Sequence, residues 1–263
     1  MSTDTAPADT DLRPTPVRDT WHVMVRELRP VLRDPFSVTF GLVQPLVFLG
    51  LYAPLLIGGS DQPAGQVLQW FVPGVLVMIV LFGTGTVGSN LQYEMMTGSH
   101  ERTLVAPLSR PALLVGRALK EIVPILAQSL IIVLVSMPFG FRPHPGGLVL
   151  GLLVLTVFGV GLGSLSYALA LATKGRDWVF WAVQQSLIFP LLILSGMLLP
   201  LDAGPGWMRL VAAFNPINWV TRAERAAISG ELTDPVVAWG ILSAMALATV
   251  GLIVGIRGMR RSN

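Results

Sequence analysis

Residues 148–173 read LVLGLLVLTVFGVGLGSLSYALALAT, a run of 26 residues without a single charged side chain. A helix needs about 20 apolar residues to cross the roughly 30 Å of hydrocarbon in a bilayer. The run therefore predicts a membrane-spanning helix that is long enough to tilt.

Five more uncharged stretches of similar length lie along the chain. Across all 263 residues, 52% are hydrophobic and only 13% are charged, about half the charged share of an ordinary soluble domain. We therefore predict an all-α polytopic membrane protein with six transmembrane helices. The other five expected spans are 36–57, 67–91, 122–139, 178–199 and 236–256.

The basic residues are distributed unevenly between the two sides that these spans would define. Of the 18 Lys and Arg residues, 14 lie on the side that holds both ends of the chain and 4 on the other. The positive-inside rule then predicts a plasma-membrane protein with both termini in the cytoplasm. The net charge of +3 reflects this topology signal, and we expect no nucleic-acid partner.

The chain lacks the residues that several classes of function require. The chain has no cysteine and no Gly-x-x-x-x-Gly-Lys-Ser/Thr loop for ATP. The six spans contain no Asp, Glu, Lys, Arg or His, which argues against proton-relay transport. Three scattered histidines, His22, His100 and His144, do not indicate a metal site. We expect no catalytic residue and no cofactor bound by this chain.

The N-terminal region divides into two parts. Residues 1–18 are rich in Ser, Thr, Asp, Pro and Ala and predict a disordered cytoplasmic tail. Residues 19–34 predict an amphipathic helix on the inner membrane surface, although an ordinary flank before the first span would look similar. Its apolar face is expected to include Trp21, Met24, Leu28 and Val31.

The expected outer loop at 200–235 is long and half apolar. It is too short and too charged to span the membrane twice, so it predicts one or two short helices that dip into the outer leaflet and break at Asn215-Pro216. Trp207 and Trp219 would suit the membrane interface. A surface loop with interfacial aromatic residues is the alternative.

A segment after the second span, residues 93–110, reads YEMMTGSHERTLVAPLSR. It predicts the acidic end of a helix, a break at Gly98, a short helix and a stop at Pro107. A short rigid helix on the membrane face is a feature that another protein could push, whereas the simpler alternative is a plain connecting loop.

This segment resembles the permease subunits of type-2 ABC exporters, including drug-resistance exporter permeases of actinobacteria. Most of the family pattern Glu-x-x-x-Gly-Thr-x-Glu-Arg-Leu, followed by Pro-Leu/Val-Ser, is matched, with Ser99 where Thr is usual. A second match covers 194–200 (LSGMLLP), 206–208 (GWM) and 214–217 (FNPI). The matching residues of the first pattern include Glu94, Gly98, Glu101, Arg102, Leu104, Pro107 and Leu108.

The resemblance implies a permease domain over residues 36–261 and a second permease copy, either identical or a paralogue. It also implies a separate ATP-binding subunit that holds ATP and magnesium and contacts the 94–108 segment. The cargo would be an amphipathic or hydrophobic compound, such as a drug, an antibiotic, a lipid or a glycolipid. A membrane assembly or anchoring subunit and an ion-coupled carrier are the alternatives. In the external region the resemblance singles out Gly196, Pro200, Trp207, Asn215 and Pro216.

Overall fold

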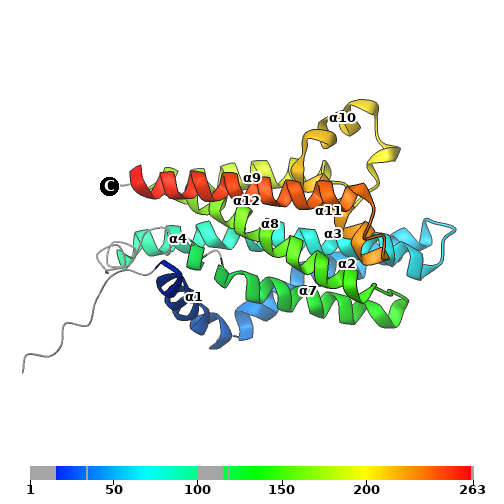
Figure 1. The fold of residues 1–263 in the computed structure, drawn as a ribbon, viewed down its shortest axis with the longest axis horizontal. Helices are drawn as coiled ribbons and strands as arrows, with labels where there is room; N and C mark the ends of the chain where they lie inside the picture. The colour runs from blue at the N-terminus through cyan, green and yellow to red at the C-terminus, as the bar shows by residue number, and fades with distance from the viewer. Residues whose placement is uncertain (1–15, 34, 100–114, 118, 262–263) are drawn as a thin grey trace, which may run out of the picture.

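The computed structural model describes residues 16–33, 35–99, 115–117 and 119–261, and every regular element within them is helical (Figure 1). Two of these elements, η1 and η2, are single 3₁₀ turns. The elements are α1 (Pro16–Arg33), α2 (Pro35–Gly58), α3 (Ala64–Gly83), α4 (Gly85–Met96), α7 (Ile122–Ser136), η1 (Met137–Phe139), α8 (Pro145–Ala172), α9 (Asp177–Ile193), η2 (Leu201–Ala203), α10 (Gly206–Phe214), α11 (Pro216–Ser229) and α12 (Pro235–Arg261).

The apolar runs form long helices, as the sequence predicts. Among the described residues, five helical stretches are long and apolar enough to cross a membrane, and α9 is a sixth apolar helix of 17 residues. The chain is therefore a polytopic, multi-pass membrane protein. The five stretches are Gly41–Gly58, Ala64–Met96, Val115–Phe139, Pro145–Ala172 and Pro235–Met259.

The expected fifth span, 178–199, is wrong at its C-terminal end. The α9 helix stops at Ile193, and the chain turns over the next residues although they remain apolar. Gly196 has φ +67°, a left-handed conformation that glycine adopts without steric cost. Backbone geometry, not hydrophobicity, ends this helix.

One helix forms the centre of the bundle. An 18-residue window of Ala64–Met96 is 78% buried, compared with 22% for the windows of Gly41–Gly58 and Pro235–Met259. The α3 helix is therefore enclosed by its neighbours, whereas α2 and α12 leave wide apolar faces for lipid.

The α8 and α12 helices pack extensively against each other and cross through glycine. A Cβ atom on Gly161 would lie 2.7 Å from the backbone nitrogen of Ala248, and one on Gly251 would lie 2.3 Å from the carbonyl oxygen of Gly161. Any side chain at either position would push the helices apart. The glycine run of α8 therefore serves close helix packing.

The two ends of the bundle carry different elements. The α1 helix and the C-terminal end of α12 lie at one end, and α10 lies at the other (Figure 1). The α1 helix begins at Pro16, so the expected disordered tail cannot extend to residue 18 as predicted. The rest of that expected tail, residues 1–15, lies outside the described residues.

Candidate functional site

A group of charged side chains joins four helices at the α1 end of the bundle. We call Glu27, Glu94, Arg117, Lys120 and Glu121 the charge cluster. The side chains of Arg117 and Lys120 are only 5% and 9% exposed. Charges removed from water to this degree must be paired, because an isolated buried charge is very costly.

Arg117 is the centre of the charge cluster. It forms an ion pair with Glu94 at the end of α4, and its Nε lies 3.8 Å from Oε1 of Glu27 in α1. It also donates a hydrogen bond to the Tyr167 hydroxyl of α8 at 3.4 Å. Lys120 adds a contact of 3.9 Å to Glu27 and one of 3.6 Å to Glu121. The arrangement fixes α1 against the start of the third span.

The expected coupling residues are only partly covered by the structure. Glu94 points into the bundle to pair with Arg117, and Gly98 ends α4 with φ +68°. The other predicted residues, Glu101, Arg102, Leu104, Pro107 and Leu108, lie outside the described residues. The role of this segment in coupling stays a prediction.

The α1 helix presents two different faces. Val23, at 1% exposure, packs against the bundle near Gly116, and Glu27 follows one turn later on the same face. Trp21 is 61% exposed, and Met24 and Leu28 are half-buried. The predicted apolar face is thus separate from the face that contacts the spans. The side chain of Val31, also predicted for the apolar face, lies outside the description.

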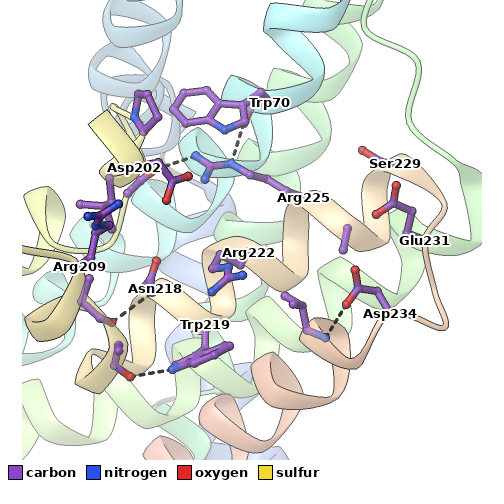
Figure 2. A pocket seen from close by; sticks show the side chains of 17 residues that line it. Trp70, Asp202, Arg209, Asn218, Trp219, Arg222, Arg225, Ser229, Glu231 and Asp234 are labelled. Carbon is purple, nitrogen blue, oxygen red and sulfur yellow. Dashed lines mark hydrogen bonds between the residues drawn. The ribbon is translucent and has the colours of Figure 1, made fainter. Parts of the chain in front are cut away.

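A pocket of about 530 Å³ opens at the α10 end of the bundle (Figure 2). Its walls come from η2, α10, α11, the turn into α12 and Trp70 of α3. Three arginines and three carboxylates lie among these residues: Arg209, Arg222, Arg225, Asp202, Glu231 and Asp234.

Arg225 holds the wall of this pocket together. Its Nε donates to the carbonyl oxygen of Trp70 at 2.9 Å, and its Nη2 donates to that of Gly196 at 2.7 Å. The guanidinium lies 3.9 Å from the centre of the Trp70 ring. Burial, together with the neighbouring Arg222, lowers the pKa of Arg225 to about 10, so it remains charged at neutral pH. One side chain thus joins α11 to α3 and to the turn after α9.

Two of the five predicted external residues line this pocket, and the functional role of all five stays a prediction. Asn215 caps α11 by accepting a hydrogen bond from the Ile217 backbone at 3.0 Å, and Pro216 occupies the first turn. Gly196 and Pro200 line the pocket. Trp207 is 63% exposed and does not line it.

Glu224 of α11 is buried without compensation. It is 1% exposed, and neither carboxyl oxygen has a hydrogen-bond partner among the described residues. It lies so close to α8 that a Cβ on Gly151 would come within 2.4 Å of its Oε2. Burial raises the pKa of Glu224 to about 8, so the carboxyl group is protonated and neutral at pH 7.

A second cavity, of about 300 Å³, lies among α2, α3, α4 and α7. Its lining is mostly apolar but includes the uncharged polar side chains of Gln44, Asn90 and Gln128. Glu121 also lines it, so the cavity reaches the charge cluster. Apolar walls with a few polar groups are typical of sites for small organic molecules.

Sequence reasoning missed the partners of these charges. The sequence analysis predicts no contact for Arg117. It counts Arg222 and Arg225 only among the basic residues of the outer side, and it makes no prediction for Glu224. The available signal was the presence of four charged residues, Arg222, Glu224, Arg225 and Glu231, around an otherwise apolar external segment. Charged groups in such surroundings need partners or a proton.

The bundle of long apolar helices defines an integral, multi-pass membrane protein. The particular family follows from sequence comparison. A profile described as ABC-2 type transporter matches residues 18–228, and the chain belongs to that family. It is the membrane permease subunit of an ABC transporter, a transport subunit that works with an ATP-binding partner.

Relatives from three organisms are likewise named as permeases. The chain is 27% identical over 220 residues to a daunorubicin resistance ABC transporter permease of Streptomyces coeruleorubidus, covering 83% of this chain and 77% of the relative. It is 28% identical over 242 residues to a transport permease of Porphyra purpurea, with 87% and 81% covered. A protein of Mycobacterium tuberculosis named as a doxorubicin resistance ABC transporter permease is 23% identical over 232 residues, with 86% and 83% covered.

Proposed function

We propose that this permease exports an amphipathic or hydrophobic compound across the plasma membrane, with ATP and magnesium bound by the partner subunit. The observation that carries the proposal is the cavity among α2, α3, α4 and α7. It offers hydrogen-bonding amides at Gln44 and Gln128 within apolar walls. A guest with apolar bulk and a few polar groups fits this lining better than a small ion does.

The charge cluster supports a link between this cavity and the ATP-binding subunit. Glu121 belongs to both the cavity and the charge cluster, and Glu27 connects the charge cluster to α1. A displacement of α1 or of the 94–108 segment would therefore reach the cavity through paired charges. The names of two of the three relatives given above, which refer to daunorubicin and doxorubicin resistance, agree with an amphipathic drug as cargo.

The cargo assignment is tested with the complex of this chain and its ATP-binding subunit. Gln44→Leu with Gln128→Leu removes both amides and should abolish the stimulation of ATP hydrolysis by a set of amphipathic drugs, with basal hydrolysis retained. Gln66→Leu, at an exposed position outside the cavity, is the matched control. Equal stimulation in all three proteins would refute the cavity as the cargo site. An absence of stimulation in the unmodified complex, with every drug tested, would count against export of amphiphiles.

The contact with the ATP-binding subunit is tested separately. Glu101→Arg reverses a charge within the family pattern and should weaken co-purification of the ATP-binding subunit by about tenfold or more. Glu231→Arg reverses a charge at the other end of the bundle and should leave co-purification unchanged. If Glu101→Arg co-purifies normally, the 94–108 segment is an ordinary connector.

We also propose that two permease copies form the membrane pathway, either identical or paralogous, within the surrounding membrane lipids. Both termini would be cytoplasmic, because the basic residues are concentrated on the side of the membrane that holds both ends of the chain. The chain itself would bind no cofactor.

A further inference from the structure

The pocket at the α10 end contains arginines that the protein leaves unpaired. Among the described residues, neither Arg209 nor Arg222 has a carboxylate within ion-pair distance or a hydrogen bond from its guanidinium. Both side chains are exposed to the pocket. Two cationic groups beside three carboxylates, with no ion pair between them, leave their binding capacity open to a ligand.

Arg222 is held in position for such a ligand. Its guanidinium lies 5.1 Å from the ring centre of Trp219, and the Trp219 indole in turn donates to the carbonyl oxygen of Ala213 at 2.9 Å. The contact with the ring fixes the side chain without using its N–H donors. Figure 2 shows Arg222 in the middle of the pocket, between Arg209 and the α11–α12 turn.

The carboxylates lie mainly on the opposite side. Glu231 and Asp234 are together on the α11–α12 turn, across from Arg209 (Figure 2). Asp234 accepts one hydrogen bond, from the Val236 backbone N–H to Oδ1 at 2.8 Å, which fixes the orientation of the carboxylate. Its second oxygen, Oδ2, is then available to a ligand. Asp202 lies on the same side as Arg209 (Figure 2), so the turn side of the pocket is negative and the Arg209 side is mixed, with arginine in excess.

Tryptophans place this pocket at the level of the lipid headgroups. Trp70 and Trp219 line it, and Trp207 and Trp239 nearby are 63% and 56% exposed. Trp239 also packs on Trp219, with ring centres 6.0 Å apart. Tryptophan concentrates at the membrane–water interface, so a girdle of four at one end marks that boundary.

We propose that this pocket binds the zwitterionic headgroup of an outer-leaflet phospholipid. Arg209 and Arg222 bind the phosphate, and Glu231 and Asp234 bind an ammonium group that carries hydrogen-bond donors. Phosphatidylethanolamine has both groups on one short headgroup. The inference goes beyond the proposed function, because lipid binding at this site requires neither the ATP-binding subunit nor transport.

The test uses the purified full chain in detergent and native mass spectrometry of bound lipid. Phosphatidylethanolamine should bind more tightly than phosphatidylglycerol to the unmodified protein. The double variant Arg209→Gln, Arg222→Gln should lose about tenfold or more in affinity for both lipids. Arg142→Gln changes an exposed arginine outside the pocket and should bind both lipids normally.

A second variant separates the two halves of the headgroup. Glu231→Gln with Asp234→Asn keeps the hydrogen-bond acceptor for Val236 and should remove the preference for phosphatidylethanolamine while phosphatidylglycerol still binds. Arg225 is left unchanged throughout, because it holds the pocket wall. Thermal unfolding of each variant checks that the bundle is intact.

Three results would count against the inference, the first two against the whole of it and the third against its ammonium half. Equal lipid retention by the double arginine variant and by Arg142→Gln would show that the pocket does not hold the phosphate. Displacement of both lipids by millimolar inorganic phosphate would assign the arginines to a free anion instead of a lipid. Retention of the lipid preference in the carboxylate variant would refute the ammonium half.

Discussion

At the α1 end of the bundle, the buried cations Arg117 and Lys120 lie within 4 Å of carboxylates from other helices. At the α10 end, Arg225 bonds only to carbonyl oxygens and a ring, and Glu224 has no described partner. The first end stabilises charge by pairing across helices, which ties those helices together. The second keeps Glu224 neutral by protonation and holds the charged Arg225 through carbonyl oxygens, and it leaves Arg209 and Arg222 without a partner among the described residues. We therefore expect the paired end to resist separation of its helices and the stability of the α10 end to depend on pH.

Which end faces the cytoplasm is the first way to sharpen the comparison. The chain has no cysteine, so single cysteines report without background. In intact cells, an impermeant maleimide should label Asp61→Cys, in the turn between α2 and α3, and should not label Ser99→Cys until the membrane is permeabilised. Labelling of Ser99→Cys in intact cells would show that the topology is the reverse of the predicted one, with the charge cluster at the outer face.

Removing the central cation should break the paired end. Arg117→Met leaves Glu94 without its partner in a partly buried site and should cost about 3–5 kcal/mol of the free energy of unfolding. Equilibrium unfolding in mixed detergent micelles measures the loss. Adding Glu94→Gln should recover part of it, because the two residues are coupled. A loss no larger than that of Arg142→Met would mean that the pairing contributes nothing to stability.

Neutralising Glu224 should raise the free energy of unfolding, whereas Arg117→Met should lower it. The raised pKa of Glu224 means that the folded protein keeps a proton that the unfolded chain releases above its ordinary pKa of 4.5. This contribution to stability is complete below pH 4.5 and is lost as the pH rises through about 8.

Glu224→Gln removes this dependence. It should unfold like the parent near pH 5 and become more stable than the parent by a few kcal/mol, on the order of 1.4 per pKa unit, toward pH 9. Thermal unfolding across this pH range measures the difference, and Glu231→Gln at the exposed turn is the control. A gap that does not grow with pH would show that Glu224 is solvated.

The two faces of α1 give the smallest effect. Val23→Ala removes buried methyl groups at the bundle contact and should cost about 1–3 kcal/mol of unfolding free energy. Trp21→Ala should change it by less than about 0.5 kcal/mol in detergent, because this side chain is exposed. If Trp21→Ala is the more damaging change, α1 packs on the spans through its predicted apolar face.

The sequence predicts an all-helical membrane protein and the helix break at Asn215-Pro216, because both depend on local signals. Uncharged runs of the right length mark the spans, and Asn215-Pro216 carries both a cap and a helix start. It does not predict the end of α9 at Ile193, because the apolar composition continues past the turn.

The pairing of charges was beyond sequence reasoning for a different reason. Glu27, Glu94 and Arg117 come from three segments, and only the packing of α1 against the spans brings them together. On the sequence alone, Glu27 falls on the polar side of the predicted amphipathic helix. Glu224 carries no prediction from the sequence, and only the packing of α8 shows that it is covered.

One consequence follows from the glycine crossing of α8 and α12. Gly161 lies 6 residues from Tyr167, which contacts the charge cluster, and 10 residues from Gly151, which contacts Glu224. At 1.5 Å per residue the two arms measure about 9 Å and 15 Å. A helix that tilts about this crossing moves its ends in opposite directions, and a tilt of about 5° displaces Gly151 by roughly 1.3 Å. If α8 tilts about this crossing, a small motion beside Arg117 becomes a larger one beneath α11.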